Sequence, residues 1–293
     1  MRGAAELSVI LVNFNDRSHL GACLDSIRAA TVKLSAEVIL VDNDSDDGSP
    51  EFVREAFPWI KLIVNGHNTG FAKANNAGIR ASNSRHILFL NTDTVVPPDA
   101  FALLLAELER RPGAGAIGPA LIRENSSFQV SFGGDIGFFA ELRQKLFLNP
   151  YYRIVLKHSR GVRSVGWLSG ACLLARRDAV EAAGLFDEGF FIYFEDIDLC
   201  RRIGDLGLEL LYDPSVRVVH FGGATTAPRR LKSRLHYRES QLYYYEKHGA
   251  GLSVFLLKRY LRLSLTGMKV FRVRTAEERA LLGQLEDKIS GRR

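Results

Sequence analysis

Residues 86–93 read HILFLNTD, an apolar run that ends at the carboxylate of Asp93. A second apolar run, FFIY at 190–193, leads into the acidic cluster FEDID at 194–198. Carboxylates at the rim of a core lose solvation, so they are usually paired, bound to a metal or tuned for proton transfer. One cluster could therefore hold a hard cation such as Mg²⁺ or Mn²⁺, and the other could supply a general base.

Apolar strand-like runs alternate with helix-like segments through the first 120 residues. We expect strands at 8–12, 38–41, 60–64 and 86–90, and helices at 18–30, 50–57, 72–80 and 98–110. This alternation predicts an α/β domain with a mostly parallel sheet.

The pattern loosens over 123–163, which we interpret as an excursion from the sheet that faces an acceptor. Further strands are expected at 167–175, 208–212 and 216–219, and helices at 177–183 and 195–207, with Ile197 and Cys200 facing inward. We predict a catalytic domain over 1–228, with a nucleotide-binding half at 1–120 and an acceptor-binding and catalytic half at 121–228. A basic, tyrosine-rich helical segment is expected at 229–293.

The net charge of +6 is unevenly distributed along the 293 residues. Residues 221–293 hold 16 of the 39 lysines and arginines but only 6 of the 33 acidic residues, which gives +10 there and −4 elsewhere. This asymmetry suggests an anionic partner, either a membrane or a nucleic acid. A solvated helical face is the alternative.

The cysteine content and the N-terminus suggest a cytoplasmic protein. Cys23, Cys172 and Cys200 are odd in number and widely spaced, so we expect small buried thiols rather than a disulfide framework. No signal peptide is visible before the first expected strand. The longest charge-free stretch, Ser164–Ala175, is too short to span a bilayer.

The acidic stretch VDNDSDDGS at 41–49 follows an expected strand. Its spacing resembles an EF-hand loop, but Asp47 stands where glycine is needed and Val53 where glutamate is needed. A turn at the carboxyl end of a strand fits better, and that edge binds ligands in open α/β sheets. Asp42 there could accept a hydrogen bond from a nucleobase, although turn and cap chemistry is the alternative.

Two glycine-containing stretches could suggest phosphate binding. In HNTGFAKANN at 67–76, Gly70 permits close backbone approach and Lys73 could reach a diphosphate, unless this is an ordinary strand–helix connection. GAGAIG at 113–118 matches GxGxxG but follows a helix, so we reject it as a dinucleotide fingerprint and expect a loop that leads into a strand.

Asp93, His220 and the acidic cluster at 195–198 could also carry chemistry. Asp93 could chelate a divalent cation together with donor phosphates, and His220, which ends a later apolar strand, could be a second ligand; each alone is more often structural. Glu195, Asp196 and Asp198 lie at an expected helix start. The helix dipole favours acidic residues there, which is the structural alternative to a role in chemistry. Asp196 and Asp198 cannot share one helix face, so at least one must point elsewhere, into a cleft.

Together these motifs resemble glycosyltransferase family 2, the inverting enzymes of the A-type nucleotide-binding fold, and among them the bacterial rhamnosyltransferases that build surface polysaccharide. The resemblance covers about residues 7–222 and rests on Ser8–Asn15, Val41–Asn43 with Ser45 and Gly48, Asn68, Gly70–Phe71, Asn75–Asn76, Asn91–Asp93, Trp167–Ala171, Phe186–Phe191, Glu195–Asp196, Asp198–Cys200, Arg202 and His220. It implies an α/β A-type fold whose mostly parallel central sheet is flanked by helices.

The resemblance also implies a role for each candidate residue. The implied residues are Asp42, Asn13, Asn68, Gly70, Lys73 and Asn75 for the nucleotide; Asp93 and His220 for Mg²⁺ or Mn²⁺; Asp196 as base with Glu195 beside it; and Asn91, Trp167, Gly170 and Asp198 for sugar and acceptor. One departure is Asn91, which replaces the first aspartate of the usual Asp-x-Asp and should lower metal affinity.

The resemblance therefore implies single-displacement sugar transfer from a dTDP- or UDP-sugar, with L-rhamnose from dTDP-rhamnose as first expectation, to a hydroxyl of a glycan or lipid-linked acceptor. Alternatives are a catalytically inactive nucleotide-sugar-binding protein, against which Asp93 and Asp196 both argue, and a nucleic-acid-binding protein, for which no motif is present. No nucleic acid is therefore expected as a partner.

The C-terminal segment is expected to attach to the inner face of the plasma membrane. Apolar side chains recur there at helical spacing among basic ones: Leu252, Phe255, Leu256, Tyr260 and Leu263, with Lys258, Arg259, Arg262 and Lys269. This mixture is typical of a helix that lies in a membrane interface. The alternative is a helix that packs its apolar face on the catalytic domain.

Overall fold

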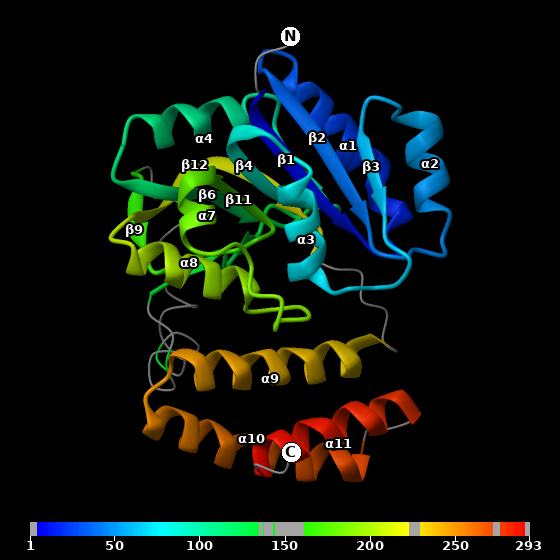
Figure 1. The fold of residues 1–293 in the computed structure, drawn as a ribbon, viewed down its shortest axis with the longest axis vertical. Coiled ribbons are helices and arrows are strands. Elements are labelled where there is room, and N and C mark those ends of the chain that lie inside the picture. Colours follow the sequence, from blue (N-terminus) through cyan, green and yellow to red (C-terminus); the bar gives the residue numbers. More distant parts are fainter. Residues whose placement is uncertain are drawn as a thin grey trace.

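A large mixed sheet organises the chain in the computed structural model, which describes residues 5–134, 137, 143, 161–222, 229–271 and 276–290 (Figure 1). The strands are β1 (Ala5–Asn13), β2 (Ala36–Asp42), β3 (Lys61–Val64), β4 (Ser84–Asn91), β5 (Thr94–Val95), β6 (Ala114–Ile122), β7 (Phe128–Gln129), β8 (Phe132–Gly133), β9 (Arg163–Val165), β10 (Trp167–Leu168), β11 (Cys172–Arg176) and β12 (Glu209–His220). The helices are α1 (Arg17–Thr31), α2 (Ser49–Ala56), α3 (Phe71–Arg80), α4 (Ala100–Glu109), α7 (Arg177–Ala182), α8 (Glu195–Asp205), α9 (Arg229–His248), α10 (Gly251–Phe271) and α11 (Ala276–Ser290).

The sheet is parallel in its first half and mixed in its second. Its order is β3-β2-β1-β4-β11-β6-β12-β5, with β7 beside β6 and β9 beside β12. Strands β3, β2, β1 and β4 are all parallel, which confirms the prediction for the first 120 residues. Strand β11 then runs antiparallel between β4 and β6, so the parallel pattern does not continue through the second half.

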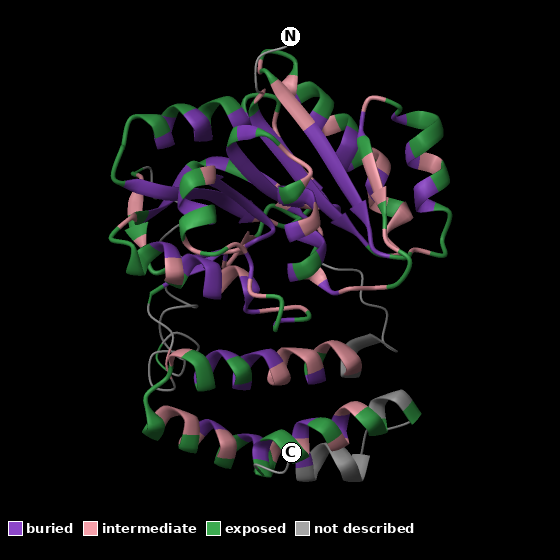
Figure 2. Ribbon diagram, viewed as in Figure 1, coloured by how far each residue is buried: buried purple, intermediate pink, exposed green. Residues whose placement is uncertain are grey.

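The sheet has two buried faces, because successive side chains along a strand point to opposite sides. Along β1, Leu7, Val9 and Leu11 pack on one face and Ile10 packs on the other. Helices α1, α2 and α4 cover the first face, and α3, α7 and α8 cover the second. The buried stripe of α1 includes Leu24, whose full burial contributes roughly 2 kcal/mol. Figure 2 shows the central strands buried along most of their length.

Three expected elements differ in detail from the structure. The strand expected at 167–175 is divided into β10 and β11, because the chain turns at Gly170 to meet Asp196. The two strands expected at 208–219 are one strand, β12, whose register shifts between Asp213 and Arg217. The stretch at 113–118 is not a loop: most of it lies in β6, where a Cβ on Gly115 would come within 2.6 Å of an Ile203 methyl group.

The remaining expectations for the first 222 residues hold where the structure describes them. The other predicted strands and helices are confirmed, and all three cysteines are buried free thiols. Cys200 is buried as expected, whereas Ile197 is only partly buried. Most of the expected acceptor-facing excursion lies outside the described residues, namely 135–136, 138–142 and 144–160.

The C-terminal segment is helical, as predicted, and packs as a layer beside the sheet domain. Helix α9 lies next to the domain, and α10 and α11 lie beyond it (Figure 1). Leu242 of α9, Leu261 of α10 and Leu285 of α11 belong to the same hydrophobic cluster as Phe89 in the sheet and Leu199 in α8. The layer therefore shares its core with the domain. Within the part of the chain that the structure describes, no helix is both long and apolar enough to cross a membrane.

Candidate active site

The candidate residues meet at one edge of the sheet. The carboxyl ends of β1, β2 and β4 lie side by side, since Asn13 pairs with Asp42 and Val12 pairs with Asn91. Strand β11 is antiparallel to β4, so the loop before β11, which contains Gly170, reaches the same edge. This is the edge at which open α/β sheets bind ligands.

Asn13 and Asp42 form a buried polar pair at this edge. The Asn13 amide donates hydrogen bonds to Asp42 Oδ2 at 2.8 Å and to Ser45 Oγ at 3.0 Å. The backbone amide of Ser45 donates to Asp42 Oδ1 at 2.9 Å. Asn13 Oδ1 is buried and finds no hydrogen-bond partner among the described residues. Because buried acceptors are normally satisfied, this oxygen suits a ligand N–H group such as that of a nucleobase.

The loop before α3 is ordered by its own side chains. Asn43 donates to Asn68 Oδ1 at 2.8 Å and accepts from the Thr69 amide at 3.0 Å, and the Gly70 amide donates to Asn68 Oδ1 at 3.0 Å. Gly70 has φ +85°, and a Cβ there would lie 2.7 Å from the carbonyl oxygen of Phe191. The close backbone approach that we expected at Gly70 is therefore made by the chain itself.

Helix α3 presents one candidate residue outward and buries another. Lys73 is exposed on the first turn, in agreement with a side chain that could reach a diphosphate. Asn75 is buried and donates to the Phe71 carbonyl oxygen at 3.0 Å, so its amide acts within the helix. The neighbouring Asn76, which was not among the predicted site residues, bonds both backbone polar groups of Phe186, at 2.9 and 3.0 Å.

Asp93 and His220 are brought together although 127 positions separate them in the chain. His220 Nε2 lies 3.2 Å from Asp93 Oδ1, and the two side chains are about nine-tenths buried. His220 Nδ1 lies 3.0 Å from Gln129 Oε1, an acceptor, so Nδ1 carries a proton. Nε2 then faces the carboxylate of Asp93. A metal ion is one species that this pair of ligand atoms could bind.

The donor set at this position fits Mg²⁺ or Mn²⁺. Neighbouring ligands of an octahedral ion with bonds near 2.1 Å lie about 3 Å apart, which matches the pair. Asn91 contributes a neutral amide whose nitrogen lies 3.4 Å from His220 Nε2. The described residues contain no group of three histidine, cysteine or acidic side chains that could hold a metal. Such an ion would therefore need ligands from the bound donor.

Sequence reasoning missed a polar cluster beside this pair. Thr92 Oγ1 donates to Asp16 Oδ2 at 2.8 Å, and His19 Nδ1 lies 2.5 Å from Asp16 Oδ1. The His19 ring stacks on Phe221 at 5.1 Å, directly after His220. Asp16 could have been suspected, since it follows the first strand at the ligand edge. Gln129 gave no signal, because nothing in its local sequence indicates its contact with His220.

Asp196 stands at the start of α8 and is held by backbone amides. The Gly170 amide donates to Asp196 Oδ2 at 2.7 Å, and the Ile197 amide lies 2.8 Å from Oδ1. A Cβ at position 170 would lie 3.1 Å from the Asp196 Cβ, so glycine permits this contact. Burial raises the pKa of Asp196, and the two amides oppose the shift. A carboxylate with a raised pKa is a stronger base.

Glu195 has a different environment from Asp196. It is buried, and its Oε2 atom has no hydrogen-bond partner among the described residues. Burial raises the pKa of Glu195 well above its ordinary value, and the negative charges of Asp196 and Asp198 add to the rise. The pKa values of both neighbours are therefore raised by burial, and nearby carboxylates add to the rise at Glu195.

Asp198 does point away from Asp196, but not toward an open site. It is fully buried, with Arg202 Nη2 2.6 Å from Oδ2, and His248 Nε2 at 2.6 Å and Lys247 Nζ at 2.8 Å from Oδ1. Both carboxylate oxygens are thus occupied by cationic partners. For this reason we no longer include Asp198 among the sugar- and acceptor-binding residues.

Trp167 lies in β10, next to α8, and is partly buried against the core. Its indole Nε1 is buried and lacks an acceptor within the described part of the chain. Tyrosine and tryptophan donors normally have a partner when buried. The unpaired N–H group could donate to a bound ligand, and the expected role of Trp167 in sugar or acceptor binding stays a prediction.

Comparison with known proteins identifies the sequence pattern and the fold. The family described as Glycosyl transferase family 2 matches residues 8–182. The N-acetylglucosaminyl-diphospho-decaprenol L-rhamnosyltransferase of Mycobacterium tuberculosis is 31% identical over 263 residues, which cover 83% of this chain and 85% of that protein. The pre-mycofactocin glycosyltransferase of the same species is 27% identical over 217 residues, which cover 73% of this chain and 42% of that protein.

Two solved structures share the fold. The mannosyltransferase PcManGT from Pyrobaculum calidifontis, solved with GDP-Man and Mn²⁺, is 18% identical with a TM-score of 0.60, and the match covers 97% of this chain and 80% of that one. GalNAc-T7, solved with UDP, GalNAc and Mn²⁺, is 18% identical with a TM-score of 0.59, and the match covers 84% of this chain and 50% of that one. These matches establish the A-type fold.

Proposed function

Because this chain belongs to glycosyltransferase family 2, we propose that it transfers L-rhamnose from dTDP-rhamnose to a hydroxyl of a lipid-linked glycan acceptor. Family membership makes it a transferase enzyme. The choice of rhamnose and of a lipid-linked acceptor is supported by the name of the mycobacterial relative, which includes both. The product would enter the synthesis of a bacterial surface polysaccharide.

The observation that carries this proposal is the connection between the Asp93–His220 pair and Asp196. Asn91, two residues before Asp93, donates its backbone amide to the Ala171 carbonyl oxygen at 3.1 Å. The adjacent Gly170 amide donates to Asp196 at 2.7 Å. The pair proposed to bind a cation and the carboxylate proposed as the base are therefore connected through one short loop, which supports a common site.

Each residue at this edge of the sheet would contribute to a different part of the transfer reaction. Asn13 and Asp42 would hold the nucleobase, and Lys73 would approach the diphosphate. Asp196 would remove the proton of the acceptor hydroxyl as its oxygen attacks the anomeric carbon, and this single displacement inverts the anomeric configuration. Asp93 and His220 would hold Mg²⁺ or Mn²⁺, which neutralises the charge of the departing nucleoside diphosphate when bound.

A protonated Glu195 fits this scheme. A second ionised carboxylate beside Asp196 would repel it and bring a further uncompensated charge into the core. With its proton retained, Glu195 adds no charge, so Asp196 alone acts as the base. We therefore assign Glu195 the role of a neutral neighbour.

We also propose that α10 attaches the enzyme to an anionic membrane surface, where a lipid-linked acceptor lies. The buried side of α10, its inner row, packs through Leu257 and Leu261. Its outer row is apolar too: Leu252, Phe255 and Leu263 are 62%, 59% and 78% exposed. The helix thus packs one apolar row against the rest of the protein, as the alternative expected, and leaves a second apolar row exposed. Exposed basic residues accompany the outer row, namely Arg259 and Arg262, and they complement anionic headgroups.

Release of nucleoside diphosphate from a set of donors tests the proposed activity. The set should include dTDP-rhamnose and several UDP-sugars, each with Mg²⁺ or Mn²⁺ and a diphospholipid-linked N-acetylglucosamine acceptor. We expect acceptor-dependent release from dTDP-rhamnose and an inverted anomeric centre in the product by NMR. Release from a UDP-sugar alone would reassign the donor, and a retained configuration would contradict the role of Asp196.

A further inference from the structure

The turn that carries Glu195 and Asp196 has an unfavourable backbone. Tyr193 and Phe194 have φ values of +70° and +67°, so two consecutive aromatic residues adopt the left-handed region. Side chains with a Cβ rarely adopt this conformation, and it persists only where the surroundings enforce it. Phe194 is also the residue that precedes the first turn of α8. Whatever holds this turn therefore sets the direction in which Asp196 points.

The surroundings that hold the turn come largely from α9. The Tyr237 ring packs on Phe194 at 5.2 Å and on Tyr193 at 5.8 Å. Ser240 Oγ, one turn further along the same helix face, donates to the Ile192 carbonyl oxygen at 2.7 Å. Thus one face of α9 contacts three consecutive residues just before Glu195.

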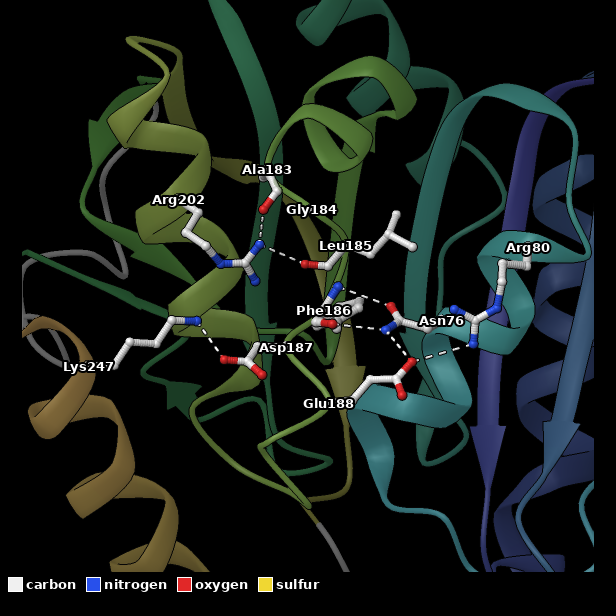
Figure 3. Close-up of a pocket in the computed structure, with 10 residues that line it drawn as sticks. All are labelled: Asn76, Arg80, Ala183, Gly184, Leu185, Phe186, Asp187, Glu188, Arg202 and Lys247. Atoms are coloured by element: carbon white, nitrogen blue, oxygen red, sulfur yellow. Dashed lines mark hydrogen bonds and ion pairs between the residues drawn. The ribbon is translucent and has the colours of Figure 1, made fainter.

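Lys247 connects both ends of the same segment. Its ammonium group lies 2.6 Å from Asp187 Oδ2 and 2.8 Å from Asp198 Oδ1. Figure 3 shows Lys247 extending from α9 to Asp187, at the rim of a pocket that Arg202 also lines. Asp187 precedes the turn and Asp198 follows it in the first turn of α8. One side chain of α9 therefore bridges Asp187, before the turn, and Asp198, after it.

The opposite side of the segment rests on α3. The Phe71 amide donates to the Phe191 carbonyl oxygen at 2.6 Å, and Asn76 holds Phe186, as Figure 3 shows. Residues 186–194 therefore lie between α3, at the start of which the donor is proposed to bind, and α9. If α9 were displaced, the segment would keep its contacts with α3 and with Phe89 of the sheet but would lose those that α9 makes with the turn.

We propose that α9 is a positioning element for catalysis: Tyr237, Ser240 and Lys247 keep the Tyr193–Phe194 turn in its left-handed conformation and so aim Asp196 at the acceptor hydroxyl. This inference rests on the proposed function for the identity of the base, and it assigns a catalytic contribution to the segment after residue 228. None of these three side chains needs to touch the substrates. A misplacement of the base by about 1 Å can lower a rate roughly 10²-fold.

The double variant Lys247→Met, Ser240→Ala tests the proposal, because it removes three polar contacts and leaves the apolar face of α9 unchanged. Glu246→Gln is the matched control, since Glu246 lies on α9 but pairs with Lys258 at 2.7 Å, away from the turn. We expect kcat to fall roughly tenfold or more in the double variant while the donor KM stays within about twofold. The control should keep both constants.

Hydrogen exchange gives a second readout that does not require activity. The amides of residues 187–198 should exchange faster in the double variant than in the Glu246→Gln control, while binding of dTDP stays equal in the two proteins. A double variant with the kcat and exchange rates of the control would overturn the proposal, and so would a parallel loss of dTDP binding. If no donor is turned over by the parent, the proposed function fails, and the exchange rates still decide whether α9 holds the turn.

Discussion

The amide of Gly170 lies 2.7 Å from the carboxylate of Asp196 and donates a hydrogen bond to it. This contact joins the loop between β10 and β11, which reaches the ligand edge of the sheet, to the N-terminus of α8. A larger residue would crowd this contact, because a Cβ on Gly170 would approach the Asp196 Cβ to 3.1 Å. Glycine at position 170 therefore lets this backbone amide reach the carboxylate without displacing it.

Gly170→Ala should displace Asp196 without unfolding the protein. The added methyl group must push the carboxylate by a few tenths of an ångström, so we expect a roughly tenfold or larger loss of kcat with little change in donor KM. Gly113→Ala is the control, since a Cβ there meets no atom of the described residues within 4 Å. A Gly170→Ala enzyme as fast as Gly113→Ala would show that the contact does not orient the base.

Asp196→Asn should abolish transfer and leave donor binding nearly intact. An amide cannot accept the hydroxyl proton, and loss of a general base costs on the order of 10²–10⁴ in rate. Steady-state kinetics and calorimetric titration with dTDP measure the two effects separately. Asp205→Asn, at the exposed end of the same helix, is the control. Near-normal turnover by a folded Asp196→Asn protein would remove Asp196 from the mechanism.

Activity should require a divalent cation that binds through Asp93. Chelator should remove activity, and added Mg²⁺ or Mn²⁺ should restore it. Asp93→Ala should weaken dTDP binding when metal is present and change it much less when metal is absent, because the carboxylate acts on the nucleotide through the ion. Titration of dTDP under the two conditions measures this difference. Equal affinities of variant and parent with metal present would contradict the site.

Glu195 should make the enzyme less stable as the pH rises. Its pKa is raised in the folded state by burial and by Asp196. Above the ordinary glutamate pKa of about 4.3, the unfolded chain releases a proton that the native state still holds, so the free energy of unfolding falls through that window. Glu195→Gln carries no titrating proton and should show a flatter dependence. Parallel melting-temperature curves for parent and variant from pH 5 to about pH 8 would refute the raised pKa.

The outer row of α10 should bind anionic vesicles. Each basic residue near such a surface contributes roughly 1 kcal/mol, and the exposed apolar side chains add to this by insertion. We expect sedimentation with phosphatidylglycerol vesicles at low salt, less at high salt, and little with neutral vesicles. Phe255→Ser combined with Leu263→Ser should reduce binding, whereas Leu103→Ser, an exposed leucine on α4, should not. Equal binding to neutral vesicles would exclude the electrostatic contribution.

Local sequence patterns were sufficient to predict the first half of the fold and the edge at which several candidate residues meet. The strand ends at Asp42 and Asp93 are visible as apolar runs followed by polar residues, and parallel pairing brings such ends together. The division at Gly170 and the continuous β12 were not predictable, because both depend on contacts with distant elements. The environment of Asp198 was missed for the same reason: Lys247 and His248 lie about 50 positions away, on a helix whose packing no local pattern specifies.

The shared hydrophobic cluster has a consequence for how the protein unfolds. Phe89 in the sheet, Leu199 in α8 and Leu242, Leu261 and Leu285 in the last three helices belong to one contiguous set of buried side chains. Elements that share a core tend to melt together, so a single cooperative transition is the natural expectation for the whole chain. The boundary that we predict at residue 228 follows a change in composition along the sequence, and the shared cluster predicts no separate melting step there. Truncation of the protein at residue 228 would expose to water the side of α8 that faces α9.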